Sequence, residues 1–250
     1  MIDLSRRSYT KELMDGDDIP FAAMAQTLKE LNIINTRLGG HAITRKGVKQ
    51  LWQQQQPLWI CEIGCGGGDN LAAIYKEFYK KGIDVRFTGI DLNSECIAFA
   101  KQQHPHLPCE WICSDYALVD FSKRGNEVPA IIFSSLFCHH FTDEQLVPML
   151  QWLHRNSSKG FFVNDLHRHW LAYYLIKYIT KFFSKSYLVR NDACLSVARS
   201  FRPADWKKLF NEAGIGDHSI KWQWAFRYLV SYRHDPAAVR NLRLQTTPGR

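Results

Sequence analysis

The sequence of 250 residues predicts one α/β domain with a mainly parallel, seven-stranded sheet that ends in an antiparallel hairpin, helices on both faces, and a helical lid at the N-terminus. Three observations support this fold. From Pro57 onward, short apolar runs alternate with amphipathic segments, as they do in βαβ units. A glycine-rich turn follows the first of these runs. Near the C-terminus, two segments alternate apolar and polar residues across a short turn, which indicates a hairpin.

The N-terminal residues, 1–56, are expected to form the lid. Apolar residues recur at helical spacing over Ala22–Leu31, Gly39-Gly40 interrupts the pattern, and a second helix is predicted from Thr44 to about Gln54. The first residues carry charges where a secretory signal has an apolar run, and no later stretch is uncharged for long enough to span a bilayer. We therefore expect neither a signal peptide nor a membrane span, and the reduced cysteines described below lead us to expect a cytoplasmic protein.

Residues 57–250 are expected to form the α/β domain, with a helical insertion at about 167–190. The parallel strands are predicted at Leu58–Ile63, Val85–Ile90, Glu110–Cys113, Ala130–Ser134 and Gly160–Asn164. Helices are predicted between and after them at Asn70–Lys81, Ser94–Gln103, Thr142–Arg155, His169–Phe183 and Pro203–Ala213. The closing hairpin is predicted to pair Ser219–Trp224 with Tyr228–Tyr232.

Charge and cysteine content narrow the class of protein. A formal net charge of +8 would suit a polyanionic partner. However, the basic residues are spread along the chain and are densest at 167–190 and in the C-terminal tail, so we interpret them as a solvated surface and expect no nucleic acid partner. The seven cysteines lie mostly in strand-like segments, among them Cys61, Cys113 and Cys138, which is typical of reduced, buried thiols. No CxxC pair occurs, so a structural zinc site is not predicted.

The strongest functional signal is the segment EIGCGGGDN, residues 62–70, where the first strand turns into a helix. Gly64, Gly66 and Gly68 allow positive φ and a close approach of the backbone to a ligand. Asp69 stands where a dinucleotide fingerprint has its last glycine, and Glu62 precedes the turn. Both carboxylates would repel a pyrophosphate, whereas they suit the sulfonium and ammonium groups of S-adenosylmethionine. No GK[ST] follows, which excludes a P-loop.

Acidic residues end the second and third strands. Asp91, in GIDLN, can accept hydrogen bonds from both ribose hydroxyls of a nucleoside; a helix cap is the alternative role. In CSDYA, Ser114 and Asp115 follow the third strand, and a carboxylate there can accept from an adenine amino group. The neighbouring Tyr116 could pack against the adenine ring.

The fourth strand ends in SSLFCHHF. Ser134, Ser135 and Leu136 are expected beneath the methionine part of the ligand, with His139 and His140 on the open side. Because ligands of open α/β sheets bind outside the carboxyl ends of the strands, all four segments should converge at one edge.

Together, EIGCGGGDN, GIDLN, CSDYA and FSSLFCHHF resemble the ordered motifs of class I S-adenosylmethionine-dependent methyltransferases, in particular the branch related to ubiquinone and menaquinone biosynthesis, from Leu58 to about Asn164. ELMDGDDIP, the LGG at 38–40 and NDLHRHWLAYYL are similar to bacterial methyltransferases of polyketide and other secondary-metabolite pathways. The resemblance implies a Rossmann-like fold, S-adenosylmethionine as cofactor with S-adenosylhomocysteine as product, and a phenolic, quinol-like or polyketide acceptor. The expected cofactor-binding residues are Glu62, Gly64, Cys65, Gly66, Gly68, Asn70, Asp91, Leu92, Ser114, Asp115, Tyr116, Ser134 and Ser135.

A hydroxyl acceptor must lose a proton, and histidine is the usual general base. Candidate bases are His140, His139, His167 and His169. We rank His140 first because its place after the fourth strand should be nearest the sulfonium, with a structural or substrate-shaping role as an equal alternative. Asn164, Asp165 and His167 should line the acceptor side, where Asp165 could orient a histidine. A single candidate carboxylate is too little for a metal site, so no metal is predicted.

The aromatic segment His169–Phe183 admits three interpretations: a wall of an acceptor pocket, a homodimer surface, or a helix lying on a membrane. Its place directly after the fifth strand favours the first. Lys177, Lys181 and Lys185 recur every fourth residue and would form one basic stripe, which keeps contact with a membrane surface open.

Several other functions are possible for a fold of this class, and sequence features disfavour some of them. The tetrapeptide that amino-methylating DNA enzymes need after the fourth strand is replaced by SSLF, and the glutamate pair of arginine methyltransferases is missing. Glu62 and Asp69 disfavour a dehydrogenase. Carbon methylation of a quinone precursor, and a non-catalytic module that binds the cofactor, remain open.

Overall fold

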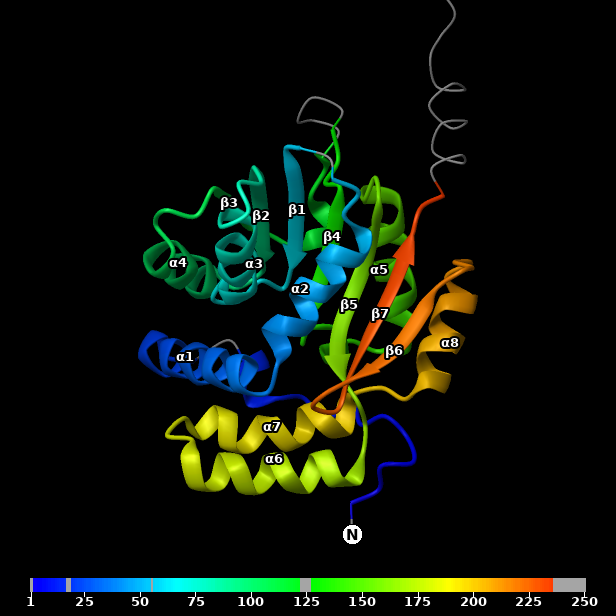
Figure 1. Ribbon diagram of the computed structural model, residues 1–250. Helices are drawn as coiled ribbons and strands as arrows, with labels where there is room; N and C mark the ends of the chain where they lie inside the picture. Colours follow the sequence, from blue (N-terminus) through cyan, green and yellow to red (C-terminus); the bar gives the residue numbers. More distant parts are fainter. Residues whose placement is uncertain (1, 17–18, 55, 122–126, 236–250) are drawn as a thin grey trace, which may run out of the picture.

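The computed structural model describes residues 2–16, 19–54, 56–121 and 127–235, and the basic C-terminal tail lies outside them. At its centre is a seven-stranded sheet with the order β3-β2-β1-β4-β5-β7-β6 (Figure 1). The strands are β1 (Leu58–Ile63), β2 (Val85–Asp91), β3 (Cys109–Cys113), β4 (Ile131–Ser135), β5 (Gly160–Leu166), β6 (Ser219–Gln223) and β7 (Arg227–Arg233). The first five pair in parallel, and β7 is antiparallel to both β5 and β6. The predicted fold class, including the closing hairpin, is confirmed.

Helices cover both faces of the sheet, because side chains of the central strands alternate between two apolar cores. In β1, Leu58 and Ile60 belong to the core under α2 (Gly40–Leu51) and α3 (Asp69–Tyr79). Cys61 and Ile63 belong to the core on the other face. That second core lies under α5 (Asp143–Asn156) and α8 (Pro203–Glu212). Every residue of β1 is buried, as expected for a parallel strand covered on both sides, and each large apolar side chain contributes about 1.5–3 kcal/mol.

A third group of helices lies at the edge where the parallel strands end. Figure 1 shows α1 (Phe21–Arg37), α6 (Trp170–Phe183) and α7 (Tyr187–Arg199) crossing this edge. α6 packs along α7, and α1 contacts α7 and α4 (Ser94–Gln103). The N-terminal helices therefore separate: α1 lies over the carboxyl edge, whereas α2 packs on the face of the sheet against β5 and β7.

The sequence does not predict α7, because polar residues interrupt any apolar stripe in YLVRNDACLSVAR. Two of its charged side chains, Asp192 and Arg199, are nevertheless buried. Asp192 accepts hydrogen bonds from the backbone N–H groups of Leu13 and Met14, at 2.8 and 2.9 Å. Arg199 donates to three backbone carbonyls, one in the N-terminal segment and two in the turn after β4. Polar interactions with distant segments therefore fix α7 in place.

The structure also bears on the exposure of the cysteines and on the length of the helices. Every cysteine is a free thiol, but Cys113 is exposed, contrary to the prediction that it is buried. The reason is its place at the end of β3, which is an edge strand of the sheet. Within the described part of the chain, no helix combines the length and apolarity that a bilayer span requires.

Candidate active site

The glycine-rich turn joins β1 to α3 in the way its sequence requires. Gly64, Gly66 and Gly68 have φ values of 64°, 50° and 76°, all in the left-handed region that side chains disfavour. A Cβ on Gly64 would overlap the ring of Phe137, and one on Gly68 would overlap Trp111. The turn therefore needs glycine both for its backbone conformation and for the packing of aromatic rings against it.

Replacing Gly64 by alanine is expected to lower the free energy of unfolding by roughly 1–3 kcal/mol more than replacing Gly82. Both glycines have positive φ, so both variants carry backbone strain of about 1–2 kcal/mol. Only Gly64 also meets Phe137, since nothing lies within 4 Å of the position of a Cβ on Gly82. Urea unfolding of the two variants measures the difference. Equal losses would contradict the close packing of Phe137.

Asp91 ties the glycine turn to the end of β2. Its Oδ2 accepts from the backbone N–H of Gly66 at 2.8 Å, and its Oδ1 accepts from that of Asn93 at 2.9 Å. Burial raises the pKa of Asp91, and the two backbone hydrogen bonds oppose that shift. Each carboxylate oxygen keeps a further lone pair, so the side chain can still accept hydrogen bonds from a ligand.

Asp91 borders a cleft of about 470 Å³, hereafter the Asp91 cleft. Its lining is Gly64, Ile90, Asp91, Leu92, Ser114, Asp115, Tyr116, Ala117, Phe137, Phe141, Gln145, Pro148, Trp152 and Arg155. Burial raises the pKa of Tyr116 to about 12, so its phenol stays neutral. The lining therefore includes both carboxylates and aromatic rings, which suits a ribose and a planar base.

Glu62 is a buried carboxylate beside the glycine turn. It is 1% exposed, and its Oε1 accepts from the amide of Asn70 at 2.9 Å. Its Oε2 has no hydrogen-bond partner among the described residues. Burial raises the pKa of Glu62 well above its ordinary value, although the Asn70 hydrogen bond opposes the shift. An acceptor atom without a partner at this place fits an ammonium group of a ligand.

Three predicted cofactor residues point elsewhere. Ser134 and Ser135 are buried in β4 and form hydrogen bonds with Cys138 and Asn164, each at 3.3 Å. Cys65 is buried, and burial raises the pKa of its thiol well above the ordinary value. None of these three lines the Asp91 cleft, and neither do the predicted residues Glu62, Gly66, Gly68 and Asn70. Contact of all these residues with the cofactor stays a prediction.

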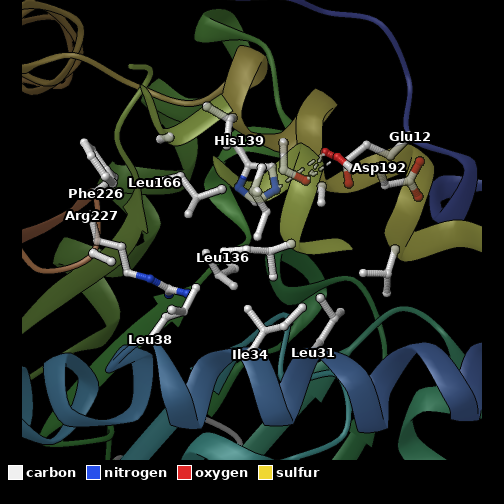
Figure 2. A pocket seen from close by; sticks show the side chains of 18 of the residues that line it. Glu12, Leu31, Ile34, Leu38, Leu136, His139, Leu166, Asp192, Phe226 and Arg227 are labelled. Atoms are coloured by element: carbon white, nitrogen blue, oxygen red, sulfur yellow. Dashed lines mark hydrogen bonds and ion pairs between the residues drawn. The ribbon is translucent and has the colours of Figure 1, made fainter. Parts of the chain in front are cut away.

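A second cavity, hereafter the apolar cavity, has a volume of about 270 Å³ and lies between α1, α6, α7 and the turn that joins β6 to β7. Figure 2 shows its wall of aliphatic side chains, among them Leu31, Ile34 and Leu136. α6 contributes Ala172, Leu175, Ile176 and Ile179, so the aromatic helix is a wall of this cavity. Trp170, Phe182 and Phe183 of the same helix are exposed. Contact of these side chains with a second copy of the chain or with a membrane surface stays a prediction.

Seven polar or charged residues line the apolar cavity among its aliphatic residues: Glu12, Thr27, His139, His140, Asp192, Ser196 and Arg227. The sequence motifs point to the two histidines but not to Glu12 or Arg227. The available signals are weak, since Glu12 lies in an irregular segment and Arg227 is a lone cation at the start of an apolar strand.

Comparison with known proteins supports the fold. Residues 60–160 match the model of the family described as a methyltransferase domain. This part of the chain is similar to a methyltransferase domain. The glycine turn, the Asp91 cleft and the unpaired Glu62 oxygen fit S-adenosylmethionine, the cofactor that the sequence motifs predict. No curated protein matches the sequence.

Solved structures of methyltransferases share the fold at low sequence identity. The plantazolicin methyltransferase BpumL in complex with S-adenosylhomocysteine is 19% identical, with a TM-score of 0.58, and the alignment covers 80% of this chain and 78% of that one. Human N-acetylserotonin methyltransferase in complex with S-adenosylmethionine is 14% identical, with a TM-score of 0.55 and coverage of 86% and 56%. Identities this low support the fold and carry no information on the acceptor of this methyltransferase.

Adjacent residues of the turn after β4 line the Asp91 cleft and the apolar cavity. Phe137 lines the cleft, and the preceding Leu136 lines the cavity. Leu136 has a φ of 53°, which is uncommon for a side chain other than glycine, and its N–H donates to the carbonyl of Asn164 at 2.9 Å. The strained turn thus separates the Asp91 cleft from the apolar cavity by two adjacent residues.

His139 is held at the wall of the apolar cavity by Asp165. Its Nδ1 lies 2.8 Å from Asp165 Oδ1, and its backbone N–H donates to Oδ2 at 3.2 Å. Its Nε2 lies 3.6 Å from Glu12 Oε1. Burial acts to raise the pKa of Asp165, but the charge and hydrogen bond of His139 outweigh it and lower that pKa. The pair is an ionised carboxylate that orients an imidazole, as in other carboxylate–histidine pairs.

His140 lines the same cavity but has a different partner. Its Nδ1 lies 2.8 Å from Asp15 Oδ1. Burial acts to lower the pKa of His140, and the charge of Arg199 adds a smaller effect in the same direction. The hydrogen bond with Asp15 and the charges of Glu12 and Asp15 outweigh both, and the pKa of His140 is raised. His140 is therefore a cation over a wider pH range than an ordinary histidine.

This ion pair predicts a pH-dependent stability. Because the folded-state pKa of His140 is raised above the ordinary 6.5, the pair stabilises the fold fully below that pH, and its contribution is lost as pH rises through the raised pKa. Asp15→Asn should thus lower the free energy of unfolding by about 0.5–1 kcal/mol more at about pH 6 than at about pH 9. Urea titrations at the two pH values measure this. In a His140→Gln background the pH dependence of the Asp15→Asn effect should vanish, and its persistence would contradict the assignment.

The remaining sequence candidates lie away from the cavity. His167 lines neither cavity, and it contacts the rings of His169, Phe226 and Tyr228. Burial lowers the pKa of His167 to about 4. Asn164 is fully buried and donates to the carbonyl of Gly40 at 3.1 Å, so it joins β5 to α2 rather than lining the acceptor side.

One group of side chains has the spacing of a metal site. Among the described residues, Glu12, His139 and His140 bring ligand atoms within 4.8 Å of one another. The guanidinium of Arg199 lies 3.8 Å from Glu12 Oε1, where its charge would repel a metal cation. The prediction that the site uses no metal stays a prediction, and we interpret the group as one that handles protons.

Proposed function

We propose that this methyltransferase methylates the hydroxyl of an apolar small molecule of the phenolic, quinol-like or polyketide type. The observation that carries the proposal is the apolar cavity, which adjoins the Asp91 cleft at the turn after β4 and has His139 in its wall. Its aliphatic lining excludes water and favours an apolar acceptor. A nucleic acid or a folded protein would need an open, polar surface at the same place.

The residues around the Asp91 cleft are assigned to the cofactor. S-adenosylmethionine, when bound, supplies an electrophilic methyl group on its sulfonium. We assign Asp91 to the ribose hydroxyls, Asp115 and Tyr116 to the adenine, and Glu62 to the ammonium group. The support is that Asp91, Asp115 and Tyr116 line one cleft and that Glu62 holds a buried acceptor without a partner.

His139 is the general base that the geometry favours, ahead of His140. Asp165 occupies Nδ1 of His139, which directs Nε2 toward the cavity and Glu12. His140, in contrast, is held by an ion pair with Asp15 of the N-terminal segment, and its Nδ1 is the atom engaged. We therefore assign to His139 the removal of the acceptor proton, and to His140 the positioning of the N-terminal segment through Asp15.

A methyl-transfer assay tests the function. A panel of phenols and quinols is incubated with isotopically labelled cofactor, and products are read by mass, with the methylated atom located by NMR. We expect transfer to an oxygen of at least one apolar member; transfer to ring carbon would support the carbon-methylation alternative. In thermal-shift titrations, S-adenosylhomocysteine at a hundred times its dissociation constant should add about 2.7 kcal/mol to stability. A shift with NAD but not with S-adenosylhomocysteine would overturn the proposal.

A further inference from the structure

The guanidinium of Arg227 is a buried cation at one end of the apolar cavity. Arg227 is the first residue of β7, pairs with Leu166 of β5, and is 2% exposed. Figure 2 shows its side chain reaching toward Leu38 and Leu136. Burial lowers the pKa of Arg227 to about 10, with the charge of Asp165 opposing the shift, so the side chain is still protonated at neutral pH.

Within the described part of the chain, this cation has no counter-ion of its own. Its Nη2 donates to Asn35 Oδ1 at 2.9 Å, and its Nη1 has no hydrogen-bond partner among the described residues. The nearby Asp165 is already bound by His139 and by the backbone N–H of Leu166, at 2.8 and 2.7 Å. The other carboxylates of the cavity, Glu12 and Asp192, lie at its opposite end (Figure 2). A buried charge without a partner costs stability, which a ligand can recover by supplying an anion.

We propose that Arg227, oriented by Asn35, binds a carboxylate of the acceptor, so that the acceptor is an apolar hydroxy acid rather than a neutral phenol. A guanidinium donates two parallel hydrogen bonds to a carboxylate, and the free Nη1 supplies the donor that such a pair needs. The cofactor also carries a carboxylate, on its methionine part. Arg227 lines the apolar cavity and not the Asp91 cleft, which favours the acceptor. This inference rests on the proposed function, because only that proposal makes the apolar cavity the site of the acceptor.

The binding test uses octanoate and octan-1-ol as probes, because they share an apolar chain and differ in charge. Calorimetric titration at neutral pH should show octanoate binding about tenfold or more tightly than octanol to the wild type. Arg227→Met should remove this preference, and Arg227→Lys, which keeps a cation, should retain part of it. Equal affinities in the wild type, no binding of octanoate, or an unchanged preference in Arg227→Met would each overturn the proposal.

A second measurement separates the two sources of carboxylate. S-adenosylhomocysteine should bind Arg227→Met and Arg227→Lys with affinity within about twofold of the wild type. A loss of ten times or more in both variants would place the cofactor's carboxylate on Arg227 and overturn the assignment to the acceptor. Melting curves check that each variant is folded. Binding of the probes does not require methyl transfer. If no compound in the methyl-transfer assay is methylated, the binding result can therefore still be interpreted.

Discussion

Asp91→Ala is expected to weaken the binding of S-adenosylhomocysteine by about a hundredfold or more. Two charge-assisted hydrogen bonds to the ribose hydroxyls would be lost, each contributing about 1.5–3 kcal/mol. The change also removes the acceptor of the Gly66 N–H, so the glycine turn loses its anchor to β2. Calorimetric titration with S-adenosylhomocysteine measures the affinity.

Asp91→Asn is the matched control, because it keeps the shape and one acceptor oxygen but removes the charge. We expect an affinity between those of the wild type and Asp91→Ala. Melting of the ligand-free variants separates a direct loss of contacts from a disordered turn. Full affinity in Asp91→Ala would refute the ribose assignment and leave Asp91 as an anchor and helix cap only.

His139→Ala is expected to lower kcat by about 10²–10⁴ on any hydroxyl acceptor found in the panel, with little change in the affinity for S-adenosylhomocysteine. The variant lacks the group that removes the acceptor proton, while the Asp91 cleft is untouched. Asp165→Asn should also lower kcat, because an amide cannot accept from His139 Nδ1 as well as an ionised carboxylate does. Steady-state rates with saturating cofactor measure both effects.

His167→Ala serves as the control, since that ring lines neither cavity. It should retain kcat within a fewfold of the wild type. His140→Ala should cost less than His139→Ala and should act mainly on stability through Asp15. A larger loss of kcat in His140→Ala than in His139→Ala would restore the order that the sequence alone suggests.

The sheet could be predicted closely from the sequence because buried parallel strands are continuous apolar runs. β1 has the predicted bounds, Leu58–Ile63, and so does α4, Ser94–Gln103. β5 runs on to Leu166, beyond the predicted end at Asn164. The reason is that Asp165 is buried within the strand and compensated by His139, whereas a carboxylate after an apolar run normally indicates the start of a loop.

The glycine turn and the residues around Asp91 were accessible to prediction because each motif is local. The apolar cavity was not, because its polar groups come from segments that no sequence pattern connects. Arg227 and its partner Asn35 are separated by 192 residues, and the bond between them depends on how β7 and α1 meet. The choice between His139 and His140 likewise required knowing which neighbouring residue faces Asp165 and which faces Asp15.

The two cavities divide along the chain in a way that bears on how such enzymes diversify. The lining of the Asp91 cleft falls entirely between Gly64 and Arg155, close to the span that matches the methyltransferase family. Apart from three residues of the turn after β4, the apolar cavity is built from segments outside that span, at 12–38 and 166–227. Mutations in those flanking segments can therefore accumulate under selection for a new acceptor while the donor-binding part of the gene stays constant.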